Sequence, residues 1–368
     1  MVSPFIYLDT TLLLSAMLWD LARQLLEVVL TPDLIVIGGL TLDNVIAADG
    51  QVQLSQSGGN GAYSAAGAVV WVDQVGLVSK SVKTYPSEAL EKFKSNGINL
   101  EGVHWSNEKV TASDWFIYDN KGNREEGLST LEKFISETEF SKSHLSPEQV
   151  LKWKNSLSER SHFCELSYST FRVQNPIEPS QIPSNWRNPK GLHIAPSQPE
   201  VMKEMLDFFG PGAGFIMSDP GWQLAEKTLD EINPILSRLD AFIPSETELR
   251  SLVPSTGLTD GLAILSRYCP GIVAVKLGME GVLIWDRKNK NTIKVPCIQT
   301  EAIDPTGAGD SFCGGFLAGF IETEDPLMAA RFGTISASKI VANFGAHTGL
   351  PFDRKIARET LKMMYDFH

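Results

Sequence analysis

The chain has 368 residues, and 43% of them are hydrophobic, which suffices for one large α/β domain with a small appendage or for two domains of ordinary size. The net charge of −12, without any run of five Lys or Arg residues, argues against nucleic acid and acidic membranes as partners. The four cysteines lie far apart and the six histidines do not cluster, a pattern typical of reduced thiols in a cytoplasmic protein without a zinc site.

An apolar stretch covers residues 12–30. Three charged residues interrupt it and no Lys or Arg precedes it, so neither a membrane span nor a secretory signal is favoured. We expect residues 1–32 to form an additional helix packed on the body of the protein, followed by one domain over residues 33–368. A membrane anchor or a targeting segment is the alternative for this stretch.

The first predicted strand is the apolar run over residues 33–37, which ends at Gly38. Such a run suits a strand buried on both faces of a parallel sheet. Asp43 therefore lies near the carboxyl end of the strand, where ligands bind in sheets of this kind. An aspartate in an ordinary turn would give the same pattern.

A glycine-rich turn then opens a helix of small residues. The turn holds Gly58, Gly59 and Asn60, and Tyr63 follows one helical turn later. Small residues allow a helix and a ligand to approach the sheet closely. The stretch is not a dinucleotide fingerprint, because Ser64 stands where that motif needs its third glycine.

Short strands drawn from about residues 40–56 and 100–125 predict a small sheet apart from the main one, with a hairpin that turns near residues 119–123. Trp105 and Trp115 are either substrate contacts beneath this sheet or core residues. Residues 124–190 contain no motif and no repeat.

Strands and helices alternate from residue 191 onward, with helices expected over residues 199–209 and 224–239. This pattern predicts a doubly wound α/β sheet with helices on both faces. Glu248 follows the strand 240–243 by a few residues, where it is either a ligand-site carboxylate or part of a helix cap.

Residues 271–285 read as two strands joined by a turn that Gly278 and Gly281 bound. Lys276, at the end of the first of these strands, either reaches a phosphate or is solvated. Asn343 ends a helix of small residues that begins near residue 329, so it is a candidate nucleotide contact or a C-cap.

The most informative stretch is Asp304-Pro-Thr-Gly-Ala-Gly-Asp310, which runs into another helix of small residues. Gly307, Ala308 and Gly309 are expected to form a strand-to-helix turn whose N–H groups make an anion site. Asp310 lies in the first turn of this helix, where it can accept a proton from an attacking hydroxyl. An ordinary helix cap is the simpler alternative.

This stretch resembles the second signature of the ribokinase (pfkB) family of sugar and nucleoside kinases, and Gly58-Gly59-Asn60 resembles the first. The resemblance covers about residues 33–351 and implies a ribokinase-like doubly wound sheet with a small β lid. The final Asn of the first signature is Tyr63 here, and the Asn of the family's Asn-x-x-Glu motif is Ser245.

The resemblance also implies roles for individual residues. Asp310 would be the catalytic base, and Gly307, Ala308 and Gly309 would hold the γ-phosphoryl group. The remaining roles are acceptor binding by Asp43, Gly58, Gly59, Asn60 and Tyr63, nucleotide binding by Lys276, Gly278, Gly281, Thr306 and Asn343, a magnesium contact for Glu248, and a monovalent-cation contact for Asp304.

The sequence therefore predicts an enzyme that transfers a phosphoryl group from ATP, with Mg²⁺ and potentially K⁺, to a hydroxyl of a sugar or sugar-like molecule. A P-loop kinase is not indicated, because its Gly-x-x-x-x-Gly-Lys-[Ser/Thr] motif is absent. A nucleoside kinase is the second reading, and a binding or scaffold protein that kept the fold without turnover is the third. We expect a small-molecule substrate, no nucleic-acid or membrane partner, and a potential homodimer through the lid.

Overall fold

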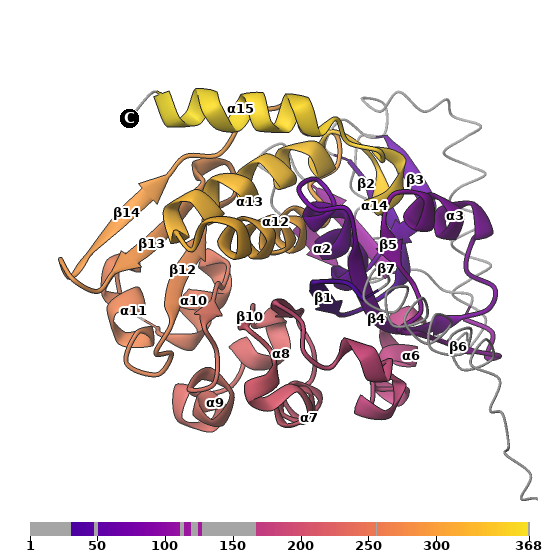
Figure 1. Ribbon diagram of the computed structural model, residues 1–368, viewed down its shortest axis with the longest axis horizontal. Coiled ribbons are helices and arrows are strands. Elements are labelled where there is room, and N and C mark those ends of the chain that lie inside the picture. Colours follow the sequence, from indigo (N-terminus) through magenta and orange to yellow (C-terminus); the bar gives the residue numbers. More distant parts are fainter. Residues whose placement is uncertain are drawn as a thin grey trace, which may run out of the picture.

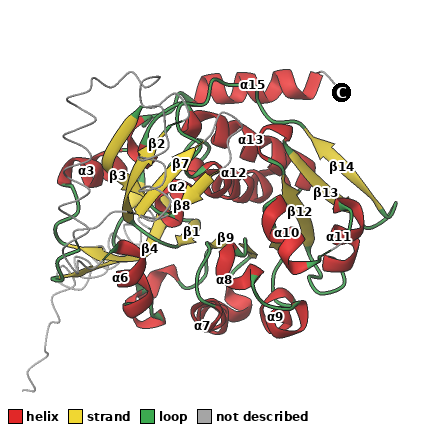
Figure 2. Ribbon diagram, turned by 180° about the vertical axis from the view of Figure 1, so that it is seen from behind, coloured by secondary structure: helices red, strands yellow, loops and turns green. Residues whose placement is uncertain are grey.

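The computed structural model describes residues 31–47, 51–110, 114–118, 124–126, 167–254 and 256–366. A large sheet runs through the body of the molecule, and a smaller sheet stands at one side of it (Figures 1 and 2). The extra helix expected over residues 1–32 lies, except for its last two positions, outside the described residues. No helix in the described ranges is long and apolar enough to cross a membrane.

The main sheet has ten described strands. In spatial order nine of them are β14 (Asn291–Val295), β13 (Val282–Asp286), β12 (Ile272–Lys276), β11 (Ala241–Phe242), β10 (Phe215–Ser218), β9 (Gly191–Ile194), β1 (Leu34–Ile37), β4 (Val75–Val82) and β5 (Ile98–Asn99). The tenth, β6 (Val103–Ser106), pairs with β4. Only β13 and β14 run antiparallel to their neighbours.

The strand order reverses at β1. The chain passes from β1 to β4 on one side and later returns to β9 on the other side, so β1 is paired with both. In an open α/β sheet, ligands bind beyond the carboxyl ends of the strands at such a reversal. Gly38 and Ala195 continue from the carboxyl ends of β1 and β9, so this part of the sheet is where a ligand is expected.

Helices cover both faces of the main sheet, as the alternating strands predicted. One face carries α2 (Asn60–Ala68), α3 (Ser87–Ser95), α12 (Ala308–Thr323), α13 (Pro326–Val341) and α15 (Arg354–Asp366), and the other carries α7 (Pro199–Phe209), α8 (Gly221–Ala225), α9 (Leu229–Leu236), α10 (Glu246–Leu252) and α11 (Leu258–Leu265) (Figure 1). Within β1, Leu34 and Val36 pack into the first of these cores and Ile35 and Ile37 into the second. This alternation explains the continuous apolar run in the sequence.

Small residues let α12 pack closely against its neighbours. A side chain at Gly314 would overlap the Ser64 backbone of α2, and one at Gly319 would lie 2.6 Å from the Phe332 ring of α13. The glycines of this helix therefore bring α2 and α13 against α12, which fixes the position of its N-terminus.

The smaller sheet has the order β3 (Val52–Gly58), β2 (Thr41–Ile46), β7 (Asp114–Tyr118) and β8 (Arg124–Glu126). The hairpin of β7 and β8 is present as expected. The second group of lid strands was expected from about residues 100–125. Within this range β6 pairs with β4 of the main sheet, so the lid strands of this group are β7 and β8. Trp105 lies in β6, half-buried against the main core. The side chain of Trp115 lies outside the described part of the structure.

The single helix expected over residues 224–239 is wrong. Two helices, α8 and α9, divide this stretch. Thr228 begins α9 because its hydroxyl accepts a hydrogen bond from Glu231 N and the Glu231 carboxylate accepts one from Thr228 N, a reciprocal cap that interrupts the preceding helix.

The remaining short helices are α6 (Tyr168–Gln174), which packs beside the lid, and α14 (Gly345–Thr348), which follows α13. Ser57 of β3 forms a hydrogen bond with His347 of α14, so the lid strand and the C-terminal region are directly joined.

Candidate active site

The glycine-rich turn before α12 has the geometry of an anion site. Gly307 is the N-cap residue and has a left-handed φ of 76°. The Ala308 N–H donates to the Pro305 carbonyl, so it is the least available of the expected donors. No described residue accepts from Gly309 N or Asp310 N, and these groups lie at the positive end of a 16-residue helix.

Asp310 lies at this helix end and is half-buried. Burial and then the charge of Asp219 raise the pKa of Asp310 to about 6, while Lys276, His193 and Arg124 act in the opposite direction. Among the described residues, no side chain hydrogen-bonds to its carboxylate. A carboxylate in this state is suited to accept a proton near neutral pH.

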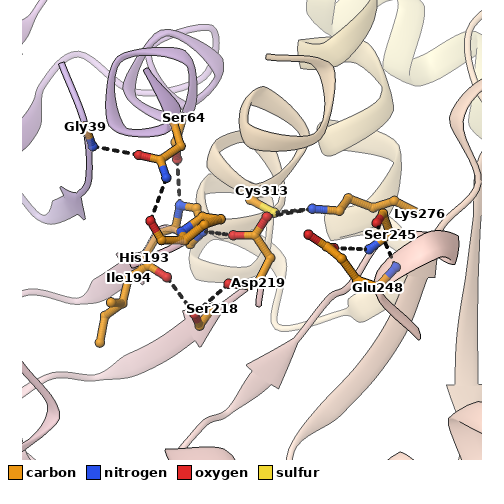
Figure 3. A network of polar contacts seen from close by, with 12 residues as sticks. Gly39, Ser64, His193, Ile194, Ser218, Asp219, Ser245, Glu248, Lys276 and Cys313 are labelled. Atoms are coloured by element: carbon orange, nitrogen blue, oxygen red, sulfur yellow. Dashed lines mark hydrogen bonds and ion pairs between the residues drawn. The ribbon is translucent and has the colours of Figure 1, made fainter. Parts of the chain in front are cut away.

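Lys276 approaches the same turn from β12. Its Nζ lies 3.4 Å from the point where a side chain at Gly309 would begin, and 2.7 Å from Asp219 Oδ2 (Figure 3). Burial acts against its charge, but Asp219, Cys313 and Glu248 together raise the pKa of Lys276. The solvated alternative for this lysine is wrong, because its side chain is only 12% exposed.

Asp304 holds the beginning of the motif against the lid. Its Oδ1 accepts from Thr306 N at 2.9 Å, and its Oδ2 accepts from Gln56 Nε2 of β3 at 3.0 Å. The Thr306 hydroxyl is 2.9 Å from the Tyr118 hydroxyl of β7. Burial raises the pKa of Asp304, although these donors oppose the shift. Two lid strands are thus bonded to the segment that leads into the anion turn.

The residues of the first signature lie at the junction of lid and main sheet. A side chain at Gly58 would overlap the Asp43 carboxylate, which also accepts from Thr41 Oγ1 at 2.9 Å. Gly59 has a φ of 97° and lies against the Gly39 carbonyl. Gly59 needs a glycine because of its φ and its backbone contact, whereas a side chain at Gly58 would displace the Asp43 carboxylate.

Asn60 and Tyr63 have structural contacts of their own. The Asn60 side chain accepts from Gly39 N at 2.6 Å and donates to the Pro196 carbonyl at 2.7 Å, so its amide joins the ends of β1 and β9. Tyr63 is 1% exposed, and its ring lies directly against Gly307. Tyr63 therefore supports the anion turn, and its buried ring offers no open face to the acceptor that the resemblance implied it would contact.

Glu248 forms a reciprocal cap with Ser245 at the start of α10. Glu248 Oε2 accepts from Ser245 N at 2.7 Å, and Ser245 Oγ accepts from Glu248 N at 3.3 Å (Figure 3). The helix-cap alternative is therefore present in the structure. It does not exclude a ligand, because Glu248 Oε1 has no hydrogen bond to a described residue and Glu248 lies close enough to affect the pKa of Lys276.

The other nucleotide candidates lie in two separate turns. Gly278 and Gly281 have positive φ values in the turn between β12 and β13, and a side chain at Gly281 would overlap the Val295 carbonyl. Asn343 directly follows Ala342, the C-cap residue of α13, and its Nδ2 donates to the Lys339 carbonyl in the last helical turn at 3.1 Å, so its side chain helps to cap the helix end.

Several polar residues of the site were not singled out in the sequence. His193, Asp219 and Ser64 form a buried chain that ends at Lys276, and Gln56 and Tyr118 reach the motif from the lid. Asp219 carried one usable signal, since it directly follows β10 at the carboxyl edge of the sheet.

The match to known proteins agrees with this geometry. Residues 189–353 match the model for the pfkB family carbohydrate kinases. The chain is 35% identical over 161 residues to an uncharacterized sugar kinase of Archaeoglobus fulgidus, a match that covers 44% of this chain and 60% of that protein. It is 25% identical over 314 residues to a cytidine kinase of Thermococcus kodakarensis, which covers 85% of this chain and 97% of that protein.

A structure of Arabidopsis thaliana ribokinase complexed with ribose and ATP superimposes with a TM-score of 0.61 at 18% identity, covering 90% of this chain and 99% of that one. The protein thus has the ribokinase fold. Over residues 189–353, somewhat less than half of its length, the chain is similar to the ribokinase-like pfkB family of small-molecule kinases.

Proposed function

We propose that the protein transfers the γ-phosphoryl group of ATP to a hydroxyl of a sugar or sugar-like small molecule. One observation carries this proposal: Asp310, with a pKa raised to about 6, stands at the N-terminus of α12 beside unpaired N–H groups and the Lys276 ammonium. A proton acceptor and a set of donors for a phosphoryl group therefore meet at one point.

The chemical step follows from this arrangement. The acceptor hydroxyl lies between Asp310 and the γ-phosphorus, and Asp310 takes its proton as the new O–P bond forms. The bond from phosphorus to the ADP oxygen breaks on the opposite side. The N–H groups of Gly309 and Asp310 and the Lys276 ammonium stabilise the charge of the transferred group, and Gly307 gives the turn its shape.

The residues expected to bind the nucleotide suit ATP and Mg²⁺. Glu248 has one carboxylate oxygen outside its helix cap and would hold Mg²⁺ directly or through water. The ion, when bound, would neutralise charge on the phosphates. Gly278, Gly281, Thr306 and Asn343 are the proposed contacts along the rest of the nucleotide.

The acceptor is proposed to bind at Asp43, Gly58, Gly59 and Asn60, beneath the lid. Burial first, and then the Asp43 charge, raises the pKa values of Tyr85 and Tyr168, so two aromatic side chains lie close to this carboxylate. A carboxylate can accept hydrogen bonds from two hydroxyls of a sugar. The aromatic surroundings are equally compatible with a nucleoside.

Two further features belong to the proposal. Asp304 is the proposed contact for K⁺, and replacement of K⁺ by choline tests it through the rate. The lid is the proposed dimer surface, since β3 is its edge strand and exposes Leu54. Light scattering on wild type and on Leu54→Lys tests this, because a charged edge should leave a monomer.

The main experiment measures ADP release from Mg-ATP with a panel of pentoses, hexoses and nucleosides. We expect turnover with one acceptor class and a loss of at least about 10³-fold in Asp310→Ala. The control variant is Glu204→Gln, because Glu204 is an exposed carboxylate of α7 that is distant from Asp310 in the sequence. Equal turnover by wild type and Asp310→Ala would contradict the proposal.

A nucleoside kinase is the second candidate, because the match to the cytidine kinase covers nearly the whole of that protein. Thermal stabilisation by nucleosides and not by free sugars would favour it. A wild-type protein that binds ATP without any acceptor-dependent turnover would instead be the non-catalytic binding protein considered above.

A further inference from the structure

A continuous chain of buried polar side chains connects α2 with Lys276 (Figure 3). Ser64 Oγ lies 2.8 Å from His193 Nδ1, and His193 Nε2 lies 3.0 Å from Asp219 Oδ1. The other oxygen, Asp219 Oδ2, lies 2.7 Å from Lys276 Nζ. The chain crosses from α2 through β9 and β10 to β12, and none of its members belongs to either signature.

The protonation states along this chain follow from its partners. Burial alone would raise the pKa of Asp219, but Lys276 and His193 lower it to about 2, so the carboxylate is ionised. An ionised carboxylate only accepts hydrogen bonds. His193 Nε2 therefore donates to Asp219, and the Ser64 hydroxyl forms the second hydrogen bond of the ring, at His193 Nδ1. Each polar atom between Ser64 and Lys276 thus has a partner of the right kind.

Without an anionic partner, the position of Lys276 would be unfavourable. Its ammonium lies against Gly309, at the N-terminal end of α12, where the helix dipole disfavours a cation. A lysine side chain also loses rotamer entropy when it is fixed. The ion pair with Asp219 compensates both costs and prevents the ammonium from turning toward solvent.

The same cluster could be read as a metal site, because ligand atoms of His193, Asp219 and Cys313 lie within 4.8 Å of one another. The Lys276 ammonium, however, already donates to Asp219 and lies 3.6 Å from Cys313 Sγ. It supplies the positive charge at that place, so a divalent cation would have to displace it.

We propose that His193 and Asp219 are positioning residues that hold the Lys276 ammonium at the Gly307–Gly309 turn, where it binds the phosphoryl group to be transferred. This inference rests on the proposed kinase function. Ser64 anchors the chain to α2, the helix that begins at Asn60 directly after Gly59. The acceptor side and the phosphate side of the site are therefore connected through one hydrogen-bonded path.

The first test is a binding measurement that needs no acceptor and no turnover. Calorimetry gives the ratio of the affinities for ATP and ADP in wild type, Lys276→Met, Asp219→Asn and His193→Leu. Loss of a charge-assisted contact to the γ-phosphate should reduce this ratio about tenfold or more in Lys276→Met. Asp219→Asn and His193→Leu should reduce it in the same direction. The control is Asp207→Asn, which removes the surface ion pair with Arg238 and should leave the ratio unchanged.

His193→Gln separates positioning from general stability, because its amide can still donate to Asp219. We expect it to restore most of the ratio that His193→Leu loses, even if the melting temperatures of both variants fall. Should His193→Leu fail to fold, Asp219→Asn and His193→Gln still decide the matter. A ratio reduced equally in the glutamine and leucine variants would overturn the role of His193.

A double-mutant cycle tests whether Asp219 acts through Lys276. If it does, Asp219→Asn/Lys276→Met should show the ratio of Lys276→Met alone. The inference would be overturned if the losses of the two single variants multiplied in the double variant. It would also be overturned if the wild-type enzyme turned over but neither single variant changed the ratio of its ATP and ADP affinities. The opposite outcome, reduced ratios in a protein without acceptor-dependent turnover, would leave this inference standing and reject the kinase function.

Discussion

The ring of Tyr63 lies directly beneath the α-carbon of Gly307. A side chain at position 307 would overlap the ring, and the φ of 76° there is itself unfavourable for any residue with a Cβ. Tyr63 comes from the first signature and Gly307 from the second, so the two motifs are packed against each other. Helix α2, which begins at the proposed acceptor site, therefore supports the anion turn through the Tyr63 ring.

Gly307→Ala should therefore damage both stability and activity. We expect a loss of about 1–3 kcal/mol in the free energy of unfolding, from the strained φ and the overlap with Tyr63. A displaced turn should reduce kcat about 100-fold or more. Gly210→Ala is the matched control, because Gly210 also has a positive φ of 47°, but a side chain there would have no atom of the described residues within 4 Å of its Cβ. Equal effects of the two variants, by urea unfolding and rate, would show that the contact with Tyr63 is unimportant.

The pH dependence of kcat/KM should report Asp310. Its pKa of about 6 predicts an acid limb near that pH, since only the ionised carboxylate accepts a proton. The groups that face it are Asp219, which raises its pKa, and Lys276, His193 and Arg124, which lower it.

Lys276→Met removes one of the cations, so the limb should move to higher pH by about one unit. Lys190→Met, which breaks the exposed pair with Asp33, should leave the limb in place. A limb that stays fixed in Lys276→Met would show that Asp310 is not the titrating group.

Asp310→Asn should stabilise the protein at neutral pH while abolishing turnover. The pKa of Asp310 is higher in the folded state than in the unfolded chain, so the native state binds the proton more tightly. Its contribution to stability is present at low pH and is lost as the pH rises from about 4 through 6. Since solvent partly screens Asp310, we expect a gain of about 1 kcal/mol at pH 7 that vanishes near pH 4. Thermal melts at both pH values check this, with Glu204→Gln as control.

The motif around Asp310 could be predicted from the sequence because its parts are contiguous. A glycine turn that opens a helix is local, and its anion-binding geometry follows from a few neighbouring residues. The path from Ser64 to Lys276 is not local, since its members come from helix α2, strands β9 and β12, and the residue that follows β10. Their meeting depends on strand order, which single-sequence patterns do not give.

The error over residues 224–239 and the open position of Trp105 had physical causes of a similar kind. The cap formed by Thr228 and Glu231 was readable in the sequence, but the apolar periodicity across it suggested one continuous helix. Trp105 lies on a strand whose pairing with β4 depends on a contact distant in sequence. The aromatic and β-branched pattern there predicted a strand without showing which sheet it joins.

The Glu248 cap allows its two roles to be separated. Glu248→Gln keeps an acceptor oxygen for Ser245 N but removes the charge, so the melting temperature should change little. The Mg²⁺ concentration that gives half-maximal rate should rise about tenfold or more if this carboxylate supports the ion. Glu231→Gln is the matched control, because Glu231 forms the same reciprocal cap with Thr228 at the start of α9. A shift of equal size in both variants would point to helix capping alone.

Two tyrosine hydroxyls near the motif should behave in opposite ways. The Tyr63 hydroxyl is buried and has no hydrogen-bond partner among the described residues, whereas the Tyr118 hydroxyl bonds to Thr306 Oγ1 at 2.9 Å. Tyr63→Phe removes an unpaired polar group, so the free energy of unfolding should stay constant or increase by about 1 kcal/mol. Tyr118→Phe should decrease it by about 1 kcal/mol, because Thr306 loses its partner.

Activity distinguishes the two variants further. Tyr118 is the contact between β7 of the lid and the segment that leads into the anion turn, so Tyr118→Phe should raise the KM for the acceptor several-fold, by about 2–10. Tyr63→Phe should leave this KM unchanged, since the ring still fills the space beneath Gly307. An increased KM in Tyr63→Phe would instead mean that its hydroxyl contacts the acceptor during the reaction.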